Sequence, residues 1–105
     1  MIKRTLETTL KKAATQYPIV TVTGPRQSGK TTLVRMAFPK YNYVSLEDPD
    51  QNAYAIEDPR GFLQQFSGKT ILDEAQRAPS LFSYIQTTVD GVGVSEKYIL
   101  SYPNF

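Results

Sequence analysis

One segment, residues 24–31, constrains this chain more than any other feature. It reads Gly-Pro-Arg-Gln-Ser-Gly-Lys-Thr and fits the pattern G-x-x-x-x-G-K-[ST] in full. Glycines at both ends allow such a loop to curl so that successive backbone N–H groups point inward, and a following helix adds its positive N-terminal end. The segment therefore predicts a cradle for the phosphates of a nucleoside triphosphate.

Two side chains at the end of this loop have specific expected roles. Lys30 is expected to reach the β- and γ-phosphates and to act in catalysis, and Thr31 is expected to offer its hydroxyl to Mg²⁺. The alternative is an ordinary strand-to-helix turn with a solvated Lys30. The residues expected to bind the nucleotide here are Gly24, Pro25, Arg26, Gln27, Ser28, Gly29, Lys30, Thr31 and Thr32.

The loop sits between a β-branched run at 19–23 and a helical pattern at about 29–38, as a phosphate site requires. Further strands are predicted at 41–46, 70–72 and 98–101. Helices are predicted at 2–17, twice between 50 and 66, and from Pro79 to Val89; Tyr17 and Phe82 are assigned to the apolar stripes of the first and last. This alternation predicts an α/β fold with a mostly parallel sheet of about four strands flanked by helices.

The composition of the chain excludes several kinds of chemistry. The 105 residues fit one domain, 1–105, and contain neither Cys nor His, which excludes thiol and imidazole chemistry. The net charge is +2 and the twelve Lys and Arg are scattered, so the sequence shows no clear nucleic-acid footprint. No run of eighteen apolar residues or apolar signal core occurs, so we expect no membrane span and a cytoplasmic location.

Two acids, Asp73 and Glu74, follow the predicted strand 70–72. The carboxyl ends of parallel strands are where such sheets bind ligands. Asp73 is expected to reach the Mg²⁺ shell, through water, and Glu74 to orient and deprotonate the attacking water as general base. The alternative is a pair of solvated acids that cap the next helix.

Taken in chain order, these motifs resemble the N-terminal core of the prokaryotic AAA-type P-loop ATPases that continue into a C-terminal domain of unknown function. Segments 24–33, 43–49, 58–63 and 71–79 carry the resemblance. It implies that ATP is bound and hydrolysed with Mg²⁺, with roles for Gly29, Lys30, Thr31, Asp73 and Glu74. It also implies the strand order 5-1-4-3-2.

The chain departs from the family after its fourth strand. There the family has a small-residue segment resembling Thr-Gly-Ser that senses the γ-phosphate, then a fifth strand and a helical lid, whereas residues 101–105 read Ser-Tyr-Pro-Asn-Phe. Ser101 is the candidate sensor, with Asn104 as a weaker one. We expect an incomplete AAA-type core in which the strand 19–23 is an exposed edge open to self-association or to a partner chain.

Hydrolysis in this class usually needs a cation aimed at the γ-phosphate. Arg26, Arg60 and Arg77 are the local candidates, although each can instead be structural. The sequence thus favours an ATP- and Mg²⁺-binding domain with weak or absent hydrolysis of its own. A degenerate protein-interaction module and a small-molecule or nucleotide kinase are the alternatives; adjacent acids and the absence of an Arg-rich lid in the sequence argue against a kinase.

Overall fold

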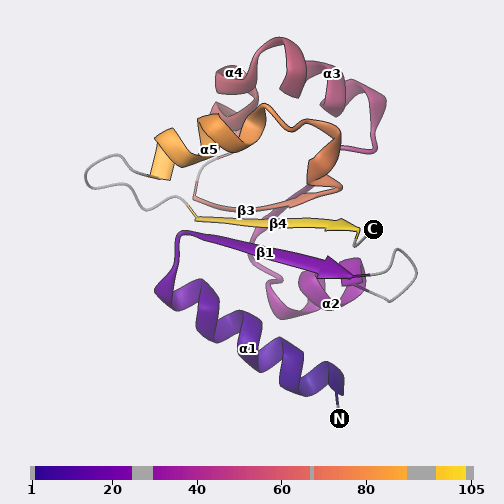
Figure 1. Ribbon diagram of the computed structural model, residues 1–105, viewed down its shortest axis with the longest axis vertical. Helices are drawn as coiled ribbons and strands as arrows, with labels where there is room; N and C mark the ends of the chain where they lie inside the picture. The colour runs from indigo at the N-terminus through magenta and orange to yellow at the C-terminus, as the bar shows by residue number, and fades with distance from the viewer. Residues whose placement is uncertain (1, 25–29, 67, 90–96, 104–105) are drawn as a thin grey trace.

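The computed structural model describes residues 2–24, 30–66, 68–89 and 97–103 of the chain (Figure 1). The elements in chain order are α1 (Ile2–Gln16), β1 (Ile19–Gly24), α2 (Lys30–Ala37), β2 (Asn42–Ser45), α3 (Pro49–Glu57), α4 (Pro59–Gln64), β3 (Lys69–Asp73), the 3-10 helix η1 (Ala75–Arg77), α5 (Leu81–Val89) and β4 (Lys97–Pro103). The predicted alternation of strands and helices is confirmed.

The four strands form one parallel sheet in the order β1-β4-β3-β2. β4 therefore lies between β1 and β3, as the resemblance implied. The register pairs Asp73 of β3 with Ser101 of β4 and with Ser45 of β2. Since all strands run the same way, their carboxyl ends lie along one edge of the sheet, as the arrowheads of β1 and β4 indicate (Figure 1).

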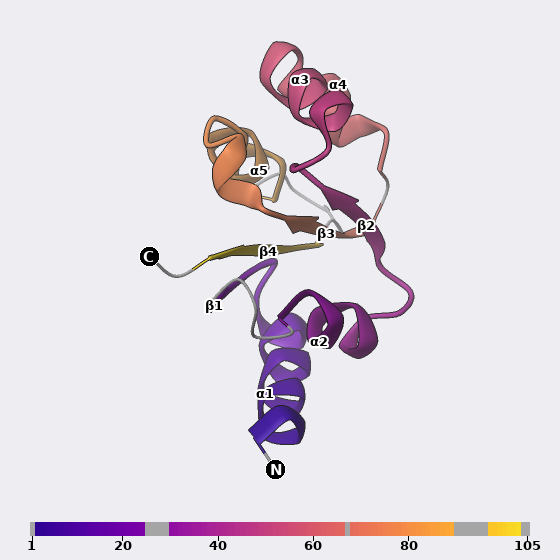
Figure 2. The same ribbon diagram turned by 90° about the vertical axis from the view of Figure 1, so that its right-hand side faces the viewer.

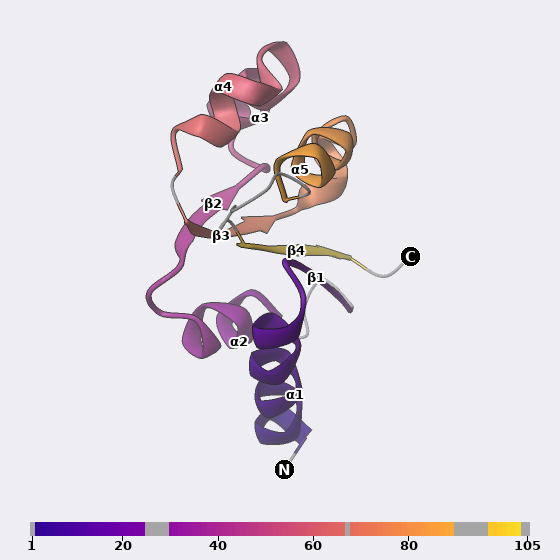
Figure 3. The ribbon, with the colours of Figure 1, turned by 90° about the vertical axis from the view of Figure 1, so that its left-hand side faces the viewer.

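Helices cover both faces of the sheet. α1 and α2 lie on one face, and α3, α4 and α5 lie on the other (Figures 2 and 3). Successive strand side chains point to opposite faces, so Ile71 and Ile99 pack towards α1 and α2 while Leu72 and Leu100 pack into the cluster under α3, α4 and α5. Burial on both faces explains why the strands read as continuous apolar runs.

The two short helices between the second and third strands each begin at a proline that follows a capping aspartate. Asp48 accepts a hydrogen bond from the Asp50 N–H at 3.3 Å before α3. Asp58 accepts one from the Gly61 N–H at 3.1 Å before α4. A proline at the first helical position of each helix costs no hydrogen bond there.

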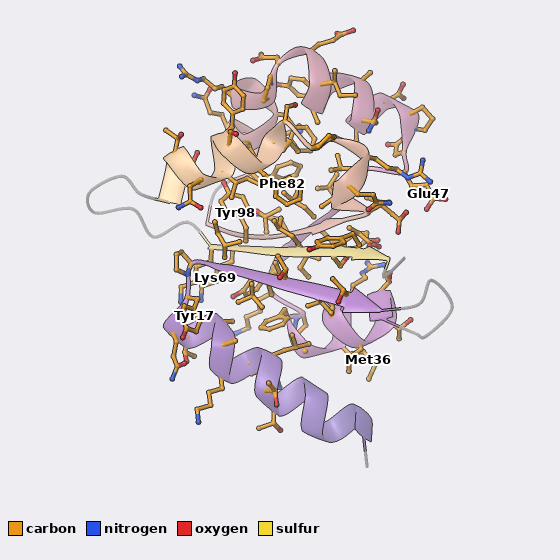
Figure 4. All side chains as sticks on the ribbon, in the orientation of Figure 1. Tyr17, Met36, Glu47, Lys69, Phe82 and Tyr98 are labelled. Atoms are coloured by element: carbon orange, nitrogen blue, oxygen red, sulfur yellow. The ribbon has the colours of Figure 1, made fainter. Side chains whose placement is uncertain are left out.

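Two residues that were assigned to buried apolar stripes of helices are exposed instead. Tyr17 lies beyond the end of α1 and is 59% exposed (Figure 4), because the helical spacing that would place it on the buried stripe ends at Gln16. Phe82 is 37% exposed because it is one residue off the buried stripe of Leu81 and Ile85. The same helix begins at Leu81 rather than at Pro79.

Strand boundaries differ as well, and β3 runs from Lys69 to Asp73 rather than over 70–72. β2 is shorter than the predicted 41–46, and β4 continues past 101 to Pro103. Ser101, predicted as the last residue of this strand, therefore lies within it. Among the described residues, no helix is both long enough and apolar enough to cross a membrane.

Candidate nucleotide-binding site

Two of the predicted site residues, Thr31 and Asp73, are in direct contact. Gly24 ends β1, Lys30 opens α2 and Asp73 ends β3, so all three lie at the carboxyl-end edge of the sheet. The Thr31 hydroxyl donates a hydrogen bond of 2.9 Å to Asp73 Oδ2. Glu47 lies on this side of the molecule and Lys69, at the start of β3, on the opposite one (Figure 4).

The Asp73 carboxylate is the centre of a buried polar cluster. It is 5% exposed. Its Oδ1 accepts hydrogen bonds from the Ser101 hydroxyl at 2.6 Å and from the Glu74 N–H at 2.9 Å, and its Oδ2 accepts them from Thr31 and from the Tyr43 hydroxyl at 2.8 Å. Both oxygens are therefore fixed by donors from neighbouring elements.

These donors also set the charge of Asp73. Burial raises the pKa of this carboxyl, but the hydrogen bonds from Ser101, Tyr43, Thr31 and the Glu74 backbone outweigh burial and leave the pKa below its ordinary value. Asp73 is consequently ionised at neutral pH, and a buried carboxylate of this kind favours a cation beside it.

Glu74, the predicted general base, has an unusual backbone. Its φ of 55° and ψ of 43° fall in the left-handed region, and among the described residues it alone, apart from glycine, has a positive φ. Its side chain is nearly buried, and its Oε1 accepts hydrogen bonds from Gln76 Nε2 at 3.1 Å and from Arg77 Nε at 3.5 Å. The carboxylate is thus held by its own segment.

Ser101, the predicted sensor, is 1% exposed and donates its hydroxyl proton to Asp73. This hydrogen bond makes Ser101 a partner of the predicted metal-binding acid. Its contact with a γ-phosphate stays a prediction.

Tyr43 is the member of the cluster that the sequence interpretation missed. It was assigned only to a half-buried strand, yet its hydroxyl reaches Asp73, and the Arg35 guanidinium lies 4.2 Å from its ring centroid. Burial, together with the hydrogen bond to Asp73 and the Asp73 charge, raises the pKa of Tyr43 to about 12, so the hydroxyl keeps its proton and donates it. Strand alternation alone does not reveal this contact, because the contact also requires that β2 lie beside β3 with Tyr43 opposite Ile71.

The structure describes only some of the remaining predicted site residues. Pro25, Arg26, Gln27, Ser28, Gly29 and Asn104 lie outside the described residues, and Gly24 and Lys30 are placed by their backbone alone. Thr32 is exposed in the first turn of α2. Arg77 contacts Glu74, and Arg60 lies 5.7 Å from the Tyr84 ring.

Comparison with known protein families matches residues 16–101 to the family described as AAA domain, which is most of the chain. The chain belongs to the AAA domain family. Among curated proteins, an uncharacterized protein of Mycobacterium tuberculosis and one of Mycobacterium bovis are each 36% identical to this AAA domain over 94 residues. The match covers 87% of this chain and 21% of each relative. No solved structure matches it.

The oxygen atoms of this AAA domain suit Mg²⁺. A carboxylate and a hydroxyl are hard oxygen ligands, and Mg²⁺ in phosphate sites takes only one or two protein oxygens and keeps several waters. Within the described residues, no three or more acidic side chains gather into a cage. The Thr31 hydroxyl can donate its proton to Asp73 and still offer an oxygen lone pair to a cation, so the pair fits the metal that the sequence motif calls for.

Proposed function

We propose that this AAA domain binds ATP with Mg²⁺ at the carboxyl ends of its strands and, by itself, hydrolyses ATP slowly or not at all. The observation that carries the proposal is the 2.9 Å hydrogen bond between Thr31 and Asp73. It joins a hydroxyl in the first turn of the helix after the predicted phosphate loop to the acid that ends β3. A phosphate site with Mg²⁺ needs these two groups side by side.

Each group has a defined part in binding. The backbone N–H groups of residues 24–31 cradle the phosphates, and Lys30 contributes a positive charge to the β- and γ-phosphates. Thr31 and Asp73 are the residues that would hold Mg²⁺. When bound, Mg²⁺ supplies the positive charge that offsets the charge developing on the phosphate oxygens.

Hydrolysis is assigned to Glu74. It orients a water, accepts its proton as the water oxygen attacks the γ-phosphorus, and the bond to the bridging oxygen of ADP breaks. Its Oε1 accepts hydrogen bonds from Gln76 and Arg77, which supports slow turnover because a base must be free to reach the water. Arg77 is paired with this acid, and Arg35 is stacked on Tyr43. These contacts also support slow turnover, because a guanidinium that is engaged with another side chain is not free for the γ-phosphate.

Replacing Glu74 with Gln tests this assignment. Single-turnover measurements with excess protein are expected to show unchanged ATP affinity and a rate about a hundredfold lower, the usual contribution of a general base. An unchanged rate would remove Glu74 from the reaction.

Calorimetric titration with ATP, in Mg²⁺ and in EDTA, tests the proposed function as a whole. Wild-type protein is expected to bind ATP with a Kd of roughly micromolar in Mg²⁺, about −8 kcal/mol. Lys30→Ala is expected to weaken binding at least about tenfold, because a charged phosphate contact is lost.

Lys40→Ala is the matched control, since it removes the same charge from an exposed position after α2. Its affinity is expected to equal that of the wild type. Absence of binding in the wild type would contradict the proposal and favour the interaction module. Equal binding by the Lys30→Ala variant would place any ATP site elsewhere.

A further inference from the structure

Tyr43 lies on β2, the outer strand next to β3, and its side chain reaches the candidate site. Its register partner in β3 is Ile71, two residues before Asp73. A diagonal contact between neighbouring strands spans about 7–8 Å, which only aromatic and other long side chains bridge. The Tyr43 hydroxyl bridges this distance and donates a 2.8 Å hydrogen bond to Asp73 Oδ2. The same oxygen accepts a hydrogen bond from Thr31.

The ring of Tyr43 is itself held in place. Arg35, from α2, puts its guanidinium 4.2 Å from the ring centroid. Both side chains line a pocket of about 540 Å³ between α2 and β2, and Thr31 and Tyr41 line the same pocket. The Tyr43 hydroxyl is therefore aimed at Asp73 by contacts from both the helix and the sheet.

We propose that Tyr43 is a positioning residue for the metal-binding pair. It holds the Asp73 carboxylate so that Oδ2 stays directed at the Thr31 hydroxyl. This inference rests on the proposed function and deepens it, because it names a residue outside the two sequence motifs on which Mg²⁺ binding depends. Ser101 and the Glu74 N–H fix the other oxygen, Oδ1; without Tyr43, Oδ2 retains Thr31 as its only donor among the described residues.

The test compares ATP affinity in Mg²⁺ with ATP affinity in EDTA, by calorimetry, for wild type and Tyr43→Phe. The substitution removes one hydroxyl and keeps the ring beneath Arg35. We expect the ratio of the two affinities to fall about threefold to tenfold, which corresponds to the net contribution of an ordinary hydrogen bond. The affinity in EDTA is expected to stay within about twofold of wild type, which a merely structural defect would not allow.

Tyr41→Phe is the matched control. Tyr41 lines the same pocket, with its ring centroid 4.8 Å from that of Phe38, and it is not among the described donors to Asp73. Its ratio is expected to match the wild type. A wild-type ratio in Tyr43→Phe overturns the positioning role alone, whereas a wild-type chain that binds no ATP overturns the proposed function and this inference together.

Arg35→Gln gives a second, independent test should Tyr43→Phe unfold. It removes the cation above the ring and leaves the Tyr43 hydroxyl present. We expect the ratio to fall in the same direction by a smaller factor. An unchanged ratio would overturn the part of the arrangement in which Arg35 holds the Tyr43 ring over the site.

Discussion

Ser101 and Asp73 lie opposite each other on neighbouring strands, and the Ser101 hydroxyl donates a 2.6 Å hydrogen bond to Asp73 Oδ1. This bond ties β4 to β3 at the edge of the sheet where the candidate site is built. Ser101 is 1% exposed, so water does not compete for the contact. The residue expected to sense a phosphate thus also supports the acid that is expected to hold the metal.

Ser101→Ala is expected to lower the free energy of unfolding by about 1.5–3 kcal/mol, because a buried hydrogen bond to a charged group is lost. Equilibrium urea unfolding measures the change. Ser83→Ala, at an exposed position of α5, is expected to be neutral or slightly stabilising, because alanine favours helix. Equal stability of the Ser101→Ala protein and the wild type would show that the bond does not help to hold the two strands.

The left-handed backbone of Glu74 gives a prediction about stability. A residue with a β-carbon pays about 1–2 kcal/mol in this region, and glycine does not. Glu74→Gly is therefore expected to be about 1 kcal/mol more stable to urea than Glu74→Ala, although both lose the contacts to Gln76 and Arg77. If the alanine variant proves as stable as the glycine variant, the φ of 55° is not a source of strain.

The outer strand β1 gives a prediction about association. Among the described strands, β1 has β4 on one side and no strand on the other. An unpaired edge of β-branched residues offers N–H and C=O groups to another chain. We expect concentration-dependent self-association in sedimentation velocity, and a reduction in Thr21→Lys, which adds charge at an exposed position of β1.

Ala53→Lys serves as the control for that experiment, because it adds the same charge on α3, away from β1. It is expected to associate as the wild type does. A wild-type protein that sediments as a monomer at all concentrations would contradict the expectation.

The fold could be predicted from the sequence because the signals that mark each strand and helix are local. A β-branched run bounded by Pro18 and Gly24, and the Asp58-Pro59 helix start, each specify their own element without help from distant residues. The errors at Tyr17 and Phe82 have different causes. Tyr17 lies just beyond the end of α1, whereas Phe82 lies within α5 next to the buried stripe, and a step of one residue turns a side chain by about 100°.

The candidate site was predicted only in part, because its geometry depends on register. Thr31 and Asp73 could be paired from their motifs, and their hydrogen bond confirms that the two lie together. Tyr43 could not be paired with Asp73 from sequence, because their contact needs both the neighbour relation of β2 and β3 and a diagonal reach. The left-handed Glu74 has no sequence signal either, since glutamate rarely adopts this conformation.

The most direct test of the proposed Mg²⁺ site measures how much Mg²⁺ strengthens ATP binding in Asp73→Asn. Glu57→Gln, which changes an exposed acid at the end of α3, is the control. We expect calorimetry to show that Asp73→Asn binds ATP in EDTA at least as tightly as wild type, because a negative charge near the phosphates is removed. The variant is expected to gain almost nothing from Mg²⁺, whereas wild type and control gain about tenfold or more. An Asp73→Asn variant that gains as much from Mg²⁺ as the wild type would contradict the role of Asp73 in holding Mg²⁺.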